Sequence, residues 1–150
     1  MPQSLSQVLI HIVFSTKDRQ RWLDATIAAG THGYLATICR DCRCEAYRVG
    51  GVPDHVHLAV RLSRTISQAD LIERLKTTSS AWIKQQGNTY RDFFWQRGYG
   101  AFSLGFSQLE ALVHYVDNQQ EHHRTRTFQQ EYRELLQKYQ IEFDERYVWD

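Results

Sequence analysis

The stretch Val52-Pro53-Asp54-His55-Val56-His57-Leu58-Ala59-Val60 decides how the chain can be interpreted. Its second half is apolar and rich in β-branched residues, which is typical of a strand. Side chains alternate between the two faces of a strand, so His55 and His57 point to one face and Val56 to the other. Two imidazoles about 6–7 Å apart on one face can share a divalent metal if a third ligand comes from elsewhere. Taken alone, the pair is also typical of ordinary histidines on a solvated strand face.

A second stretch offers the third metal ligand that the histidine pair lacks. It is Ala111-Leu112-Val113-His114-Tyr115-Val116-Asp117-Asn118-Gln119-Gln120. Its apolar residues fall at helical spacing, and Tyr115 and Gln119 are four residues apart, so they share one helix face. A tyrosine hydroxyl beside an oxygen ligand, with a histidine pair elsewhere, favours metal-assisted attack on a phosphodiester. The alternative is an amphipathic helix that places Tyr115 in the core and Gln119 in solvent. We expect the other histidines to be structural or at helix ends and the surface, namely His11, His114, His122 and His123.

In this order, the two stretches resemble the single-tyrosine transposases of small insertion sequences, the IS200-like family. Its superfamily is defined by a histidine, a bulky hydrophobic residue and a second histidine, here His55-Val56-His57. The resemblance extends from the predicted first strand, near residue 8, to the closing segment 143–150.

The resemblance implies a DNA-cutting enzyme with Tyr115 as its catalytic nucleophile. Tyr115 would form a covalent 5′-phosphotyrosine and release a free 3′-hydroxyl, so that rejoining needs no ATP. The implied metal ligands are His55, His57 and Gln119, and the implied metal is Mg²⁺ or Mn²⁺. The same donors also fit Zn²⁺. The implied partner is single-stranded DNA with hairpin ends.

Length and composition predict one cytoplasmic domain. The chain has 150 residues, of which 42% are hydrophobic and 13% aromatic, enough for one core. No apolar run approaches the ~20 residues that a membrane span needs, and Met1-Pro2-Gln3-Ser4 does not open a secretory signal. Cys39, Cys42 and Cys44 lack a second cysteine pair, which favours reduced thiols over a zinc site.

The order of predicted elements is βαββαβ followed by helices, which favours an α+β fold. We expect a ferredoxin-like, RRM-like antiparallel sheet with helices on one face and a mobile C-terminal catalytic helix. The whole chain, 1–150, then forms a single domain, with the catalytic helix at about 107–120 and a C-terminal helix and tail at about 124–150. The predicted fourth strand covers 93–104.

A basic middle segment suggests where DNA is contacted. Basic residues outnumber acidic ones between Arg61 and Gly100, although the net charge of the chain is only +1. Aromatic rings stack on unpaired bases and cations bind phosphates, so we expect Arg91, Trp95 and Arg97 to contact DNA. A solvated helix face and core packing would account for the same residues.

The resemblance and the glycines at 98, 100 and 105, before the Tyr115 helix, predict a homodimer whose active sites are shared between chains. Two other functions stay open. One is a domesticated relative that cuts host hairpin repeats, and the other is a non-catalytic module that only binds single-stranded DNA.

Overall fold

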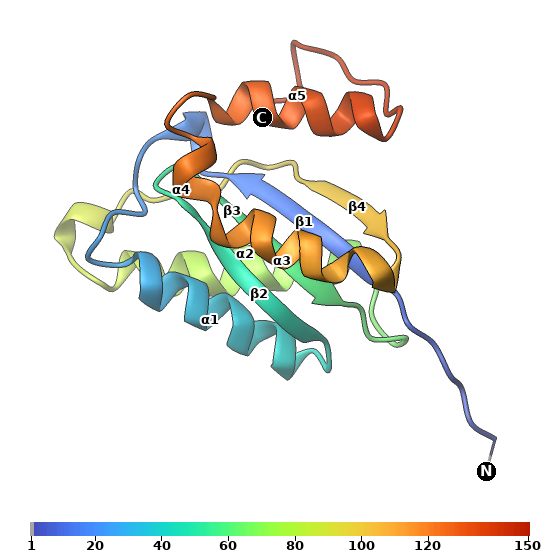
Figure 1. The fold of residues 1–150 in the computed structure, drawn as a ribbon. Helices are drawn as coiled ribbons and strands as arrows, with labels where there is room; N and C mark the ends of the chain where they lie inside the picture. The colour runs from blue at the N-terminus through green and yellow to red at the C-terminus, as the bar shows by residue number, and fades with distance from the viewer. Residues whose placement is uncertain (1) are drawn as a thin grey trace.

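The computed structural model describes residues 2–150, which contain a four-stranded antiparallel sheet in the order β2-β3-β1-β4 (Figure 1). The strands are β1 (Leu9–Ser15), β2 (Glu45–Val52), β3 (His55–Arg61) and β4 (Gly100–Leu104). Helix α1 (Ala28–Asp41) joins β1 to β2, and helix α2 (Gln68–Lys84) joins β3 to β4. This is the predicted ferredoxin-like βαββαβ arrangement, so the expected fold class is confirmed.

Alternation along the strands gives the sheet two unlike faces. On β1, Ile10, Ile12 and Phe14 pack into the main core with α1 and α2. Their neighbours His11 and Val13 point to the opposite face, and Val13 packs there against α5. In the register of β1 and β3, Val13 lies opposite His57, so the histidines of β3 share this second face.

The second face is covered by the C-terminal helices α3 (Leu109–Asp117), α4 (Gln119–His122) and α5 (Phe128–Lys138) (Figure 1). The single helix predicted over 107–120 is interrupted at Asn118, whose backbone has φ −99° and ψ 20°. The side chain of Asn118 donates to the carbonyl of His114 at 2.8 Å and ends α3. Short 3₁₀ turns lie at Lys17–Arg19, Asn88–Tyr90 and Phe106–Gln108.

The fourth strand is shorter than the predicted 93–104, because the segment before Gly100 folds into the core instead. Phe93 is fully buried there, and Lys76 Nζ donates to the carbonyls of Gln96 (2.8 Å) and Arg97 (3.1 Å). Of the three glycines that precede the Tyr115 helix, Gly98, Gly100 and Gly105, only Gly105 therefore lies between β4 and α3. Gly105 has a φ of −82°, which any residue adopts.

None of the helices in residues 2–150 is both long and apolar enough to cross a lipid bilayer. The three cysteines are buried and form no disulfide in this part of the chain.

Replacing Gly51 with alanine should destabilise the hairpin that carries His55. Gly51 has φ +156°, and a Cβ at this position would lie 2.2 Å from the carbonyl oxygen of His55, a backbone atom that cannot move aside. We expect Gly51→Ala to lower the free energy of unfolding by at least ~2 kcal/mol, measured by urea denaturation.

Gly33→Ala is the matched control, because Gly33 is exposed in α1 and a Cβ there meets no atom within 4 Å. It should stabilise the chain by ~0.5–1 kcal/mol, since alanine favours a helix more than glycine does. Equal stabilities of the Gly51→Ala variant and the wild type would contradict the described hairpin.

Candidate active site

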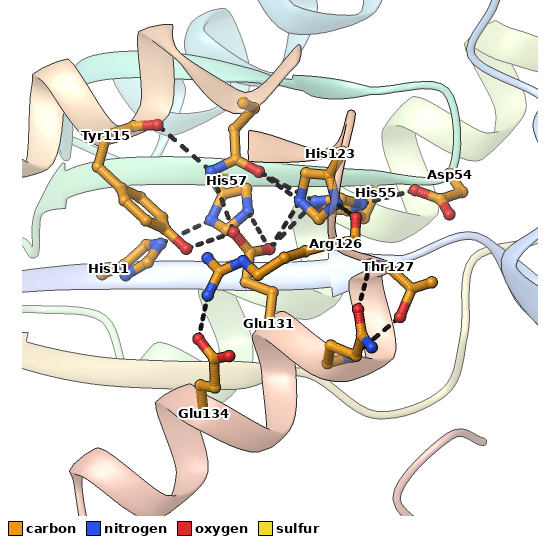
Figure 2. A network of polar contacts seen from close by, with 12 residues as sticks. His11, Asp54, His55, His57, Tyr115, His123, Arg126, Thr127, Glu131 and Glu134 are labelled. Atoms are coloured by element: carbon orange, nitrogen blue, oxygen red, sulfur yellow. Dashed lines mark hydrogen bonds and ion pairs between the residues drawn. The ribbon is translucent and has the colours of Figure 1, made fainter. Parts of the chain in front are cut away.

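Three histidines and one glutamate meet on the second face of the sheet (Figure 2). His55 and His57 come from β3, His123 follows α4, and Glu131 lies on α5. Their ligand atoms all lie within 4.8 Å of one another. Glu131 Oε1 is 3.0 Å from His57 Nε2, 3.2 Å from His123 Nε2 and 3.3 Å from His55 Nε2. We call these four residues the His₃Glu cluster.

Gln119 borders the His₃Glu cluster from α4. Its Oε1 lies 3.0 Å from His123 Nε2 and 3.2 Å from His55 Nε2, and its Nε2 donates to Glu131 Oε2 at 3.2 Å. The side chain is almost fully buried. The break in the helix at Asn118 directs both Gln119 and His123 towards β3.

Two further side chains orient the strand histidines. Asp54 Oδ1 lies 2.6 Å from His55 Nδ1, and His11 Nε2 lies 2.7 Å from His57 Nδ1. With their Nδ1 atoms engaged in these contacts, His55 and His57 both turn Nε2 towards Glu131. A neutral His57 that offers its Nε2 lone pair to a metal carries its proton on Nδ1 and donates it to His11.

The charges of the cluster are set by burial and by Glu131. Burial lowers the pKa of His55, but its hydrogen bonds to Asp54 and Glu131 outweigh burial and raise that pKa to about 9. Burial lowers the pKa of His57 to about 4 against the opposing effect of Glu131. Burial raises the pKa of Glu131, but hydrogen bonds from the three histidines lower it well below its ordinary range. Without a metal, a cationic His55 therefore faces an ionised Glu131.

Tyr115 reaches the cluster through Glu131. Its hydroxyl donates to Glu131 Oε2, and its ring lies 5.5 Å from the ring of His57 (Figure 2). Helix α3 lies close to β2 at Gly50, where an added Cβ would be 3.0 Å from Val116 Cγ1. Burial and the negative charge of Glu131 raise the pKa of Tyr115, so the phenol stays protonated.

The donor set of the cluster fits a divalent transition metal. Three imidazoles and one carboxylate converge through one atom each, and oriented Nδ1 partners lie behind two of the imidazoles. Imidazole-rich sites suit Mn²⁺ and Zn²⁺ better than Mg²⁺, which prefers oxygen ligands. A metal would be held by His55, His57, His123 and Glu131, with the amide oxygen of Gln119 at the edge.

The structure brings together His55, His57, Tyr115 and Gln119, the four residues singled out from the sequence. His123 lies at the end of α4, one of the two places expected for it, but its side chain is 9% exposed and belongs to the cluster, which was not expected. Glu131 was not anticipated at all. A signal existed, since Glu131 lies on the otherwise apolar face of α5 with Phe128, Tyr132 and Leu136.

The expected DNA contact of Trp95 needs correction. Its indole is 7% exposed, packs edge-on against Phe14 and Phe93, and donates from Nε1 to Ser79 Oγ at 2.9 Å. A base cannot stack on it without opening the core. The neighbouring Phe94 is 53% exposed, and Arg91 and Arg97 are also exposed, so DNA contacts of these two arginines stay a prediction.

A basic cavity of about 510 Å³ opens beside the cluster. His123 and Asp54 line it, together with Arg21, Arg124 and Arg126. Arg124 and Arg126 pair with Glu121 and Glu134, while no ion pair of Arg21 is found within residues 2–150. The sequence did not indicate this cavity, because its arginines come from two distant segments.

One chain supplies every residue of the cluster together with Tyr115. The predicted sharing of the site between two chains is therefore not needed to complete it. The homodimer itself stays a prediction.

Comparison with known proteins places these features in context. The sequence profile of the family described as "Transposase IS200 like" matches residues 4–119. Among curated proteins, no significant match to the chain was found.

Two solved structures share the fold. A crystal structure of a candidate transposase from Deinococcus radiodurans R1 is 20% identical, with a TM-score of 0.62 over 79% of this chain and 98% of that chain. A REP-associated tyrosine transposase bound to a REP hairpin is 13% identical, with a TM-score of 0.61 over 82% of this chain and 72% of that chain. At these identities the likeness supports the fold alone.

The metal-free protein should lose stability as the pH falls from 6.5 to 4. In this window the unfolded chain protonates His57 at an ordinary pKa of 6.5, whereas folded His57 has a pKa of about 4. Each pH unit then costs up to ~1.4 kcal/mol. His55 acts in the opposite window: its raised pKa stabilises the fold fully below pH 6.5, and this is lost as the pH rises towards 9.

Urea unfolding in EDTA at a series of pH values measures this dependence. His57→Gln should flatten the acid limb of the stability curve, and His114→Gln, at an exposed site, should keep the wild-type slope. Parallel curves for His57→Gln and wild type between pH 4 and 6.5 would contradict the assignment.

Glu131→Gln should weaken binding of Mn²⁺ by at least ~10-fold, because it replaces a charged donor with a neutral amide of the same shape. Isothermal titration of Mn²⁺ into the metal-free protein measures the affinity. Glu134→Gln makes the same change on an exposed carboxylate of α5 and should leave the affinity unaltered. If both variants bind Mn²⁺ like the wild type, Glu131 is not a ligand.

Proposed function

This chain belongs to the IS200-like transposase family, and from that premise we propose that it cleaves and rejoins single-stranded DNA through a covalent bond to Tyr115. Family membership makes it a transposase, a DNA-processing enzyme. The chemistry is our proposal. It is carried by one observation: the two oxygens of Glu131 join the Tyr115 hydroxyl to three histidines that can hold a metal.

In the proposed reaction, Tyr115 Oη attacks the phosphorus of a phosphodiester. The bond from phosphorus to the 3′-oxygen breaks, and the 5′-phosphate becomes attached to the tyrosine. The phenol proton is released to solvent water as the hydrogen bond to Glu131 Oε2 breaks, and the leaving 3′-oxygen takes a proton from water, so that no net proton is gained or lost. Attack by a free 3′-hydroxyl on the phosphotyrosine reverses these bond changes and joins the strands.

The resting charges explain why the phenol does not react unaided. Glu131 is ionised, and its negative charge opposes formation of a phenolate. A divalent metal, Mn²⁺ or Mg²⁺, would offset this charge and polarise the scissile phosphate. Asp54 and His11 keep the histidine Nε2 atoms turned towards that position.

The substrate enters, in this proposal, along the basic cavity. Arg21, Arg124 and Arg126 lie where the backbone of a DNA strand would approach the His₃Glu cluster, and arginine binds phosphate well. The REP-associated tyrosine transposase was solved with a REP hairpin. This supports hairpin-flanked single-stranded DNA as substrate for the present chain, either at the ends of an insertion sequence or, as a second candidate, in host hairpin repeats.

A module that only binds DNA is less compatible with the site. A buried carboxylate bonded to three imidazoles and a phenol is costly to maintain unless it has a chemical role.

Tyr115→Phe should abolish covalent capture of DNA. Wild-type protein with Mn²⁺ and a single-stranded oligonucleotide from the DNA flanking its own gene should give an adduct that survives denaturing electrophoresis. The phenylalanine variant lacks the attacking oxygen and should yield none, with binding changed by no more than a few-fold, measured by fluorescence anisotropy.

Tyr147→Phe, at a tyrosine that is 63% exposed, serves as the control and should form the adduct at the wild-type rate. Adduct formation by the Tyr115→Phe variant would show that another residue is the nucleophile.

A further inference from the structure

A cavity of about 280 Å³ has Tyr115 in its wall and is separate from the basic cavity described above. Leu104, Leu112 and Leu135 give it apolar sides. Tyr139, which stacks on Phe102 with ring centroids 4.9 Å apart, adds a second aromatic ring. The cavity thus combines aromatic and aliphatic walls beside the proposed nucleophile, and the proposed reaction leaves it unused.

One buried polar group belongs to the same cavity. His11 lines it and is 5% exposed, and its Nε2 is bonded to His57. Within residues 2–150, no hydrogen-bond partner of its Nδ1 is found. The imidazole of His11 therefore offers a hydrogen-bonding edge in the wall of the cavity, which a ligand with a complementary group could use.

A positive charge is the remaining feature of this cavity. Lys138 belongs to its lining, and the residue as a whole is exposed to solvent. Flat rings between apolar and aromatic walls, one hydrogen-bonding group and a nearby cation are the features that recognise an unstacked nucleotide. At 280 Å³, just below the ~300–1,000 Å³ of ordinary ligand sites, the cavity suits a base and not a larger molecule.

We propose that this cavity holds the unpaired base of a nucleotide next to the phosphate that Tyr115 attacks. The inference rests on the proposed function and adds a specificity subsite to it. Attack requires the phosphorus to lie at the Tyr115 hydroxyl, so a neighbouring nucleotide must lie beside the tyrosine ring. Insertion of its base would fix the phosphate against the hydroxyl, and His11 Nδ1 would bond the edge of that base.

The test places a larger side chain in the cavity by substituting a residue at its exposed edge. Ala111 lines the cavity but is exposed on α3, so Ala111→Trp should fold normally and place an indole where the base would lie. His114→Trp adds the same side chain at an exposed position of α3 that is not part of the lining. The probe is the single-stranded oligonucleotide from the DNA flanking the gene, with one abasic nucleotide placed at each position in turn.

Binding is measured by fluorescence anisotropy in EDTA, and cleavage separately with Mn²⁺. In wild type and His114→Trp, an abasic nucleotide at one position should weaken binding by about 10-fold, the effect of losing one stacked base. Ala111→Trp should bind the intact strand about 10-fold more weakly and should not distinguish it from the strand abasic at that position. The position should adjoin the cleaved phosphodiester.

The outcomes separate the two proposals. If Ala111→Trp responds to abasic nucleotides as the wild type does, the base subsite is overturned, whether or not DNA is cleaved. If the binding pattern is as expected but the wild type forms no covalent product, the proposed function fails and the base subsite stands. Sensitivity at a position away from the cleaved bond would overturn the placement of the base beside Tyr115.

Discussion

The ionised carboxylate of Glu131, buried among three imidazoles, is the interaction on which the second face of the sheet depends. Glu131 is 1% exposed, and an unpaired carboxylate there would cost several kcal/mol. Helix α5 can therefore dock only where the histidines can bond to Glu131. The apolar residues of the same helix face, Phe128, Tyr132 and Leu136, supply the burial, while Glu131 selects the position along β3. Hydrophobic contacts alone would allow α5 to shift along the sheet, whereas a shift would break the hydrogen bonds of Glu131 to the histidines.

Side chains alternate between the two faces of each strand, so one face of the sheet can hold polar residues while the other forms the main core. Because Val56, Leu58 and their counterparts on β1 all point to α1 and α2, the main core is complete without the C-terminal helices. The opposite face is free to hold His11, His55 and His57, each buried but each with a hydrogen-bond partner. One strand, β3, thus supplies core packing and site chemistry with alternate residues.

The parts of the site that could be predicted from the sequence are those set by local geometry. His55 and His57 share a face because a strand alternates. Tyr115 and Gln119 are four residues apart, the spacing of one helix face, although the helix is interrupted between them at Asn118. The places of Glu131 and His123 depend on how α5 docks, which no local pattern contains. Trp95 shows the same limit: a run of aromatic residues does not reveal which of them points into the core, and here Phe94 is exposed while Trp95 is buried.

The family profile ends at residue 119, yet two donors of the cluster, His123 and Glu131, lie beyond it. The segment outside the match therefore contributes to the His₃Glu cluster as well as to packing. Glu131 is shared between the two halves of the site, since Oε1 faces the histidines and Oε2 accepts from Tyr115. Positive charge brought to Oε1 draws electron density from Oε2 and makes loss of the phenol proton less costly. The charge at the histidines and the pKa of Tyr115 are thus coupled through one carboxylate.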